Sequence, residues 1–151
     1  MMSRIRSKNT KPETLLRSGL WRQGFRFRLH AQLPGKPDIL LPRWNVVVFV
    51  NGCFWHAHVG CRYFRLPSTR IEFWRDKLVG NRRRDTEAAR KLVDEGFKVI
   101  VAWECAFRAN RELAIAETAT LIRNQDNWRV AEVLSRQVNA PAADRIEVVR
   151  N

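Results

Sequence analysis

The sequence has few acidic residues for its length. Asp and Glu number 15 against 28 Lys and Arg in 151 residues, giving a formal net charge of +13 and a pI near 11.1. Such an excess on a small domain is best matched by a polyanion, and nucleic acid is the commonest one. The plainer alternative is a highly soluble or membrane-skimming basic protein. Six Trp and eight Phe favour nucleic acid, because flat side chains stack on bases.

Long apolar runs are also missing. No stretch reaches the roughly 20 residues of a membrane span, and the first ten residues, MMSRIRSKNT, lack the apolar segment of a signal peptide. We therefore expect a cytoplasmic protein that has no membrane partner. Cysteine is scarce, with three residues, and in a reducing compartment metal ligation explains them better than disulfides.

The length and the 45% hydrophobic content suit one domain with a real core. We expect this domain to span residues 1–125, with a basic N-terminal arm at residues 1–11. Beyond Asn124 the pattern weakens, so residues 126–151 are expected to be a partly ordered tail, in which residues 130–134 pack back. No internal repeat is visible.

Local patterns predict an alternation of helices and strands. Glu72 lies three residues after Thr69, a spacing that predicts a helix capped by Ser68 or Thr69 and broken near Gly80. The expected helices cover residues 10–24, 70–95 and 110–123, and the expected strands cover residues 25–30, 38–41, 46–50 and 97–102. This order predicts one α/β domain, a mixed central sheet flanked by helices.

The stretch VVVFVNGCFWHAHVGC, residues 46–61, concentrates the chemistry of the chain. An apolar run of β-formers reaches Gly52, and two cysteines, two of the three histidines and an aromatic pair follow. Groups that project from the end of a buried strand are held with the positional precision that chemistry needs. We therefore expect the functional site here.

Three cysteines and one histidine form the Cys3His set that is typical of a closed, structural zinc site. The cysteines are Cys53, Cys61 and Cys105, each at a strand end or in the loop after it. Spacing alone does not decide whether His56 or His58 completes the set, although His58-x-x-Cys61 is the better chelating spacing. The alternative is three ordinary buried cysteines.

Carboxylates are candidates for a second metal site. Asp38 follows Pro37 at the start of a strand, Glu13 lies on the first helix, and Asp85 lies on a later helix among arginines. A carboxylate at a strand entrance can hold Mg²⁺ against a phosphodiester. The pattern is weak by itself, because an Asp after Pro is usually a turn residue.

Large aromatics cluster near the same stretch. Phe54 and Trp55 cannot both enter a core that the apolar strand already fills, and Trp74 lies on the helix just after the loop. Aromatic wedges on a basic surface suit a protein that unstacks a duplex step. The alternative is ordinary core packing.

Several motifs in order resemble one known family. They are IRSKNTKPE, LPGKPDILLP, VVFVNGCFWHAH, TRIEFW and GFKVIVAWECA, and over roughly residues 2–108 they resemble the very-short-patch repair endonucleases, the Vsr family. The resemblance implies a zinc-containing relative of the restriction-endonuclease fold, related to PD-(D/E)XK nucleases. It also implies a bacterial, Mg²⁺-dependent enzyme that acts at the nucleoid and nicks one strand 5′ of the thymine in a T:G mismatch left by deamination of 5-methylcytosine.

The resemblance assigns catalytic roles. Asp38 matches the Mg²⁺-binding aspartate, and Val50 matches a position whose backbone carbonyl also ligates the ion. His56 matches the catalytic histidine, the general base for water, while Glu13 and Asp85 match supporting acids. In addition, Asn51 stands where many members carry a second histidine, which implies a slower reaction or a simpler pH profile.

It also assigns the remaining site residues. The zinc ligands by this resemblance are Cys53, His58, Cys61 and Cys105. The wedge residues that contact DNA are Phe54, Trp55 and Trp74, with Met2 reaching the minor groove from the arm. The implied partner is double-stranded DNA with a T:G mismatch, bound by a monomer that contacts mismatch-repair proteins.

Two other functions stay open from the sequence. One is a nuclease of the same fold with another DNA specificity, such as a restriction or mobile-element nuclease. The other is a non-catalytic, zinc-bearing nucleic-acid-binding module. The acids and His56 argue against the latter, because a pure binder needs none of them.

Overall fold

A computed structural model gives the fold, and the description covers residues 8–135. Its elements are α1 (Lys11–Arg22), β1 (Arg28–Leu29), β2 (Ile39–Leu41), η2 (Pro42–Trp44), β3 (Val46–Asn51), α2 (Ile71–Asp94), β4 (Lys98–Trp103), α3 (Glu104–Arg123) and β5 (Val130–Val133). The five strands form one mixed sheet in the order β1-β2-β3-β4-β5. β1, β2 and β3 pair antiparallel, whereas β3, β4 and β5 run parallel.

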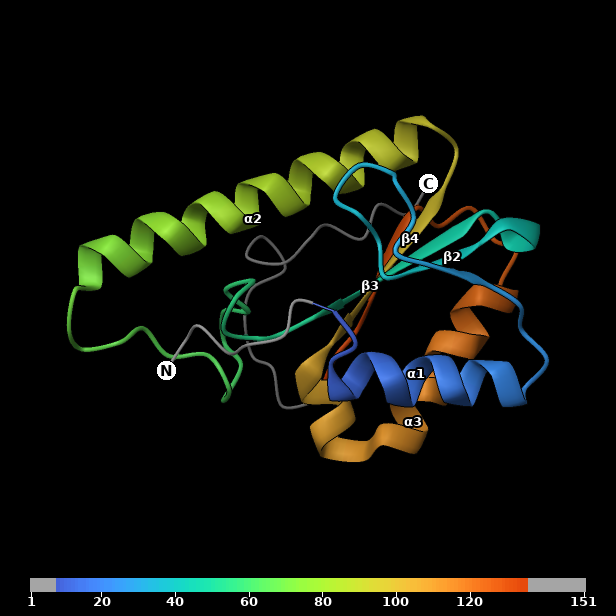
Figure 1. The fold of residues 1–151 in the computed structure, drawn as a ribbon, viewed down its shortest axis with the longest axis horizontal. Helices are drawn as coiled ribbons and strands as arrows, with labels where there is room; N and C mark the ends of the chain where they lie inside the picture. Colours follow the sequence, from blue (N-terminus) through green and yellow to red (C-terminus); the bar gives the residue numbers. More distant parts are fainter. Residues whose placement is uncertain (1–7, 136–151) are drawn as a thin grey trace.

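Helices cover both faces of this sheet, with α1 and α3 together on one side and α2 on the other (Figure 1). Side chains of β3 point alternately to the two faces of the sheet, which explains why helices pack on both. Val46 and Val48 pack in the core with Leu16 of α1, while Val47 packs in a second core with Leu92 of α2. Successive side chains of a strand point to opposite faces, so an unbroken apolar strand must be buried on both. The predicted mixed α/β architecture is confirmed.

The start of α1 was predicted correctly. Thr10 accepts a hydrogen bond from the Glu13 amide, and the Glu13 carboxylate accepts one from the Thr10 amide at 3.0 Å. This reciprocal capping box satisfies two amides that a helix start would otherwise leave unpaired. It also fixes Glu13, which is buried, at the edge of the functional site described below.

The predictions for α2 were wrong in two respects. The residue before its first turn is Arg70, which has a left-handed backbone (φ 53°), and neither Ser68 nor Thr69 caps the helix. The helix also runs unbroken through Gly80, because the Asn81 side chain donates to the Trp55 carbonyl and ties this turn to the loop after β3. A single glycine costs only about 1 kcal/mol in a helix interior, which such contacts offset.

Other boundaries also differ from the sequence expectations. Only Arg28–Leu29 of the predicted strand 25–30 pairs in the sheet, because its neighbour β2 is only three residues long. α3 begins at Glu104 and bends at Asn110, whose side chain accepts from the Leu113 amide and so starts the second segment where the sequence predicted a helix. Val130–Val133 forms an edge strand that the sequence analysis did not assign. Within residues 8–135, no helix has the length and hydropathy needed to span a membrane.

Candidate active site and metal centre

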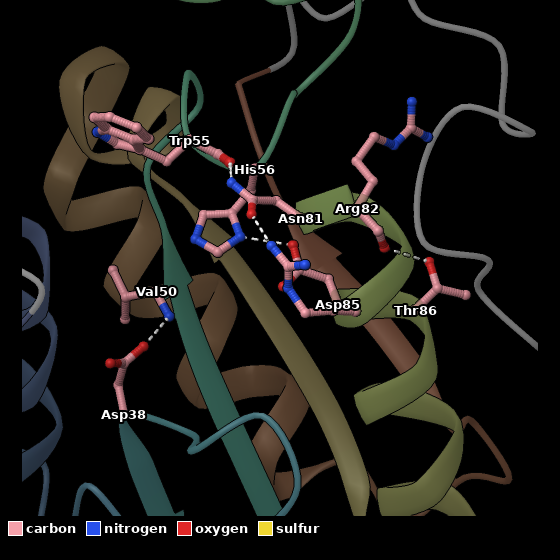
Figure 2. Close-up of polar contacts among 9 residues, drawn as sticks. Asp38, Val50, Trp55, His56, Asn81, Arg82, Asp85 and Thr86 are labelled. Atoms are coloured by element: carbon pink, nitrogen blue, oxygen red, sulfur yellow. Dashed lines mark hydrogen bonds and ion pairs between the residues drawn. The ribbon is translucent and has the colours of Figure 1, made fainter. Parts of the chain in front are cut away.

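Asp38 lies where β2 begins, beside the end of β3. Its side chain accepts a hydrogen bond from the Val50 amide at 2.7 Å, and its own amide donates to the Val48 carbonyl at 3.0 Å. Figure 2 shows the carboxylate directed at Val50, near the end of the strand that leads to His56. The antiparallel pair β2–β3 therefore places an aspartate of one strand against the backbone of the next, which orients it firmly.

The protonation of Asp38 is strongly perturbed. Burial raises its pKa from the ordinary 3.8 to about 7; the Val50 amide opposes this rise, and the nearby Glu13 carboxylate adds to it. Two carboxyl groups in a partly dry site repel each other when both are ionised, so a cation between them would relieve the cost. When its ring is protonated, His56 acts in the same sense as such a cation and lowers the Asp38 pKa.

A third residue completes this cluster, and the sequence analysis missed it. Ligand atoms of Glu13, His30 and Asp38 lie within 4.8 Å of one another. The pairing of β1 with β2 accounts for the position of His30. Leu29 pairs with Ile39, so the next residue, His30, comes opposite Asp38. Sequence reasoning did not pair these two strands, and so it left His30 without a role.

His56 and Asp85 form the second polar centre, and their interaction is close. Nδ1 of His56 lies 2.6 Å from Oδ2 of Asp85, and the two side chains are 31% and 27% exposed (Figure 2). An ionised carboxylate can only accept, so Nδ1 carries the proton and the neutral ring presents an unprotonated Nε2. The contact therefore sets the tautomer that a general base requires.

The sequence analysis predicts that Asp38 and the His56–Asp85 pair serve one site. Figure 2 shows the His56 ring and the Asp38 carboxylate at the same end of β3, with Val50 between them. His56 is in the loop after β3, Asp85 is on α2 and Asp38 precedes β2, so three separate segments contribute. Asn51, the last residue of β3, is buried.

The Cys3His set is gathered in one buried place. Ligand atoms of Cys53, His58, Cys61 and Cys105 lie within 4.8 Å of one another, and all four residues are buried. The edge of a tetrahedral zinc-thiolate site is about 3.8 Å, and Cys105 Sγ lies 3.7 Å from His58 Nδ1. The donor set and its spacing fit a structural zinc ion, and His58 rather than His56 belongs to it.

Protonation of the thiols also suits a cation. A hydrogen bond from Cys53, followed by one from His58, lowers the pKa of Cys105 from 9.0 to about 4. The same bond to Cys105 raises the pKa of Cys53, and burial raises that of Cys61. The Cys105 thiolate is thus stabilised by hydrogen bonds from neighbouring ligand groups. A bound zinc ion would take the place of those protons, because zinc binds thiolates and releases their protons.

The His58 ring is held in its plane by stacking on Trp103, with 3.9 Å between centroids and 7° between planes. Its Nε2 has no hydrogen-bond partner among residues 8–135. Trp103 closes β4 and Cys105 opens α3, so this ligand set joins the loop after β3 to the β4–α3 junction. The short segment 54–57, which includes His56, lies between two members of this set, Cys53 and His58.

The aromatic residues singled out from the sequence meet at the N-terminal end of α2. Ring centroids of Phe54, Trp55 and Trp74 are 5.1, 5.6 and 6.0 Å apart in the three pairs, and each residue is half-buried. Phe73, which the sequence analysis did not single out, is 45% exposed beside Trp74. Lys77 lies within 6.0 Å of the Trp55, Phe73 and Trp74 rings. The three rings of the first group are inclined to one another by 84°, 64° and 59°, and Lys77 lies beside this aromatic cluster. Met2 lies outside the described residues.

Comparison with known proteins agrees with this geometry. The sequence model of the family described as DNA mismatch endonuclease Vsr matches residues 1–62. The DNA mismatch endonuclease Vsr of Escherichia coli strain K12 is 37% identical over 139 residues, which cover 91% of this chain and 86% of that protein. This chain belongs to the Vsr family. The family consists of DNA endonucleases, so the chain is an enzyme of that class.

Further relatives of this Vsr-family chain are named as nicking enzymes. The type II nicking enzyme V.XorIIP of Xanthomonas oryzae pv. oryzae is 49% identical over 106 residues, covering 70% of this chain and 77% of the relative. The type II nicking enzyme V.NmeAIP of Neisseria meningitidis is 41% identical over 124 residues, covering 82% and 87%. The Vsr resemblance inferred from short motifs thus extends over most of the chain.

Proposed function

We propose that this Vsr-family enzyme is a Mg²⁺-dependent endonuclease that nicks one DNA strand 5′ of the thymine in a T:G mismatch. The observation that carries the proposal is the 2.6 Å contact between His56 Nδ1 and Asp85, which prepares a base at the end of β3 that Asp38 shares. The names of the relatives support a strand-nicking, mismatch-directed activity, since one is a DNA mismatch endonuclease and two are nicking enzymes.

Asp38 is the proposed holder of the cation, with the backbone carbonyl of Val50 and with Glu13 in support. The fit rests on the neighbouring carboxylates of Glu13 and Asp38 and on the Asp38 pKa, which burial raises to about 7 and a bound cation would lower. Bound Mg²⁺ would supply Lewis-acid activation of the scissile phosphate and charge stabilisation for the leaving 3′ oxygen.

His56 is the proposed general base. Its Nε2 accepts a proton from the water molecule that attacks phosphorus, while Asp85 stabilises the imidazolium that forms. The new P–O bond forms as the bond from phosphorus to the 3′ oxygen breaks, and that oxygen takes a proton from solvent. The products are a 3′-hydroxyl and a 5′-phosphate. Asn51, the last residue of β3, cannot titrate, so one histidine is proposed to govern proton transfer.

Phe54, Trp55 and Trp74 are the proposed wedge. Their rings are already packed together and half-exposed, so little conformational entropy is lost when they enter a base step. Unstacking costs a few kcal/mol and least at a mismatched pair, which makes the same contact a source of selectivity. Met2 from the N-terminal arm is proposed to assist from the minor groove.

Zinc is proposed at Cys53, His58, Cys61 and Cys105 as a structural ion that stiffens the loop of His56 and the wedge. The relation to the PD-(D/E)XK fold and the division into a nuclease domain at residues 1–125 and a tail are proposed in the same way. So are a monomeric state, contacts with mismatch-repair proteins and a place of action at the bacterial nucleoid.

The test is strand-resolved cleavage of matched duplexes that differ only in a T:G or a T:A pair. With Mg²⁺ we expect a single nick 5′ of the mismatched thymine, little cutting of T:A, and no product from Asp38→Ala. Asp76→Ala, which removes an exposed carboxylate of α2, serves as the control and should retain activity.

Equal cutting of the T:G and T:A duplexes would favour a nuclease with another specificity. Salt-dependent binding without scission in any divalent ion would favour a pure binding module. Activity of Asp38→Ala equal to that of the unaltered protein would refute the assigned site.

A further inference from the structure

His30 occupies a place in the sheet that faces the proposed cation site directly. It follows β1, and its amide donates to the Asp38 carbonyl at 3.1 Å, which extends the β1–β2 ladder by one pair. This hydrogen bond holds His30 beside Asp38 at the end of the two strands.

The cluster that results has three members from three elements. Ligand atoms of Glu13, His30 and Asp38 lie within 4.8 Å of one another. Glu13 is held by the capping box of α1 through Oε2, and its carboxylate also interacts with that of Asp38. His30 Nε2 is buried and has no hydrogen-bond partner within residues 8–135. A buried polar atom without a partner is rare in folded proteins and calls for an explanation.

The backbone at His30 points in the same direction. Its φ of 51° lies in the left-handed region, which side-chain-bearing residues adopt at a cost. Conformations of this kind persist where the surrounding structure over-determines them, and they concentrate at functional sites. A turn alone would be served more cheaply by glycine.

We propose that His30 is a third ligand of the cation site of Asp38 and Glu13, and that its imidazole makes this site bind Mn²⁺ more tightly than Mg²⁺. The inference rests on the proposed function only in taking Asp38 as the holder of the catalytic cation. Mg²⁺ binds hard oxygen donors, whereas an imidazole nitrogen strengthens sites for transition metals. A carboxylate–carboxylate–imidazole set therefore shifts the choice toward Mn²⁺.

The direct test is pulsed electron paramagnetic resonance of the zinc-containing protein with one equivalent of Mn²⁺. Zinc is diamagnetic and stays silent, so the spectrum reports the second cation alone. We expect modulation from an imidazole ¹⁴N in the unaltered protein and its loss in His30→Gln. His56→Ala is the matched control and should retain the modulation, since the proposal makes His30 the ligand.

Affinity gives an independent readout. We expect His30→Gln to weaken Mn²⁺ binding by at least about tenfold and Mg²⁺ binding by much less, because the amide oxygen of glutamine still suits the harder ion. Both ions should lose binding in Asp38→Asn. Circular dichroism checks that each variant is folded.

Three results would overturn the inference: no ¹⁴N modulation, modulation that survives in His30→Gln, or equal losses for the two ions. Its failure and that of the proposed function are separable. Mismatch nicking without imidazole coupling removes only the role of His30, and imidazole coupling without nicking removes only the assigned reaction.

Discussion

At the scale of single residues, the pairing with Asp85 sets the tautomer of His56, the proposed general base. The carboxylate holds the proton on Nδ1, and the 2.6 Å contact also fixes the ring orientation. We expect Asp85→Asn to lower the single-turnover nicking rate by about 100-fold or more, because an amide can donate to Nδ1 and stabilise the wrong tautomer.

Affinity for mismatched DNA should hardly change in that variant, since Asp85 acts through the histidine. Asp76→Asn makes the same charge change on the same helix at an exposed position and should leave the rate intact. A rate loss as large in Asp76→Asn would mean that the charge of α2, not the tautomer, governs the reaction.

The raised pKa of Asp38 predicts a cost in stability. Because the native protein binds this proton more tightly than the unfolded chain, its contribution is fully present below the ordinary pKa of 3.8 and is lost as pH rises to about 7. We expect metal-free Asp38→Asn to be more stable than the unaltered protein above about pH 7, by roughly 1–3 kcal/mol.

Urea unfolding at a series of pH values measures this difference, which should vanish near pH 4. Added Mg²⁺ should stabilise the unaltered protein but not the variant, since a ligand that binds only the native state shifts the folding equilibrium. A difference that is constant across pH would contradict the assigned ionisation.

At the scale of elements, the segment between β3 and α2 depends on its ligand set more than on its secondary structure. Residues 52–70 form turns and bends but no helix or strand, and three of the four proposed zinc ligands, Cys53, His58 and Cys61, lie within them. We expect removal of zinc by a chelator to abolish amide protection in residues 52–67.

The same treatment should leave the amides of α1 protected, because the core in which α1 packs contains none of the ligands. Hydrogen exchange read by mass spectrometry resolves the two regions, and Cys105→Ser should reproduce the effect. Loss of protection everywhere at once would instead mean that the zinc set is required for the whole fold.

The continuity of α2 gives a second test at this scale. A methyl group at Gly80 would meet only the end of the Arg84 side chain, at 3.4 Å. We expect Gly80→Ala to raise the free energy of unfolding by about 0.5–1 kcal/mol. Gly96, with φ of +95°, is the matched control, and Gly96→Ala should destabilise by about 1 kcal/mol. Destabilisation by Gly80→Ala would contradict the continuous helix and support the break that the sequence analysis predicts near Gly80.

Elements were predicted well where the signal is local. The start of α1 at Thr10 and the apolar run of β3 are each signalled within a few residues, so sequence was enough. The start of α2 depends on a left-handed Arg70, and the edge strand Val130–Val133 depends on pairing with β4. Such features are set by tertiary contacts that no local pattern contains.

At the scale of the whole molecule, the sheet is what joins the separate motifs. The Cys3His set was predictable because its ligands have a distinctive chemistry at any distance in the sequence. His30 was not, since its role follows from the β1–β2 register rather than from its neighbours. Phe73 was missed for a similar reason: only its exposure beside Trp74 identifies it.

The central claim is that Asp38 and His56 act on one phosphate, although 17 positions and two strands separate them in the sequence. A double-mutant cycle on the single-turnover nicking rate of a T:G duplex tests it, using Asp38→Asn, His56→Ala and their combination. Groups that act as a unit are strongly non-additive. We predict that the double variant is no slower than the slower single variant, whereas a loss equal to the product of the two single losses would contradict the account.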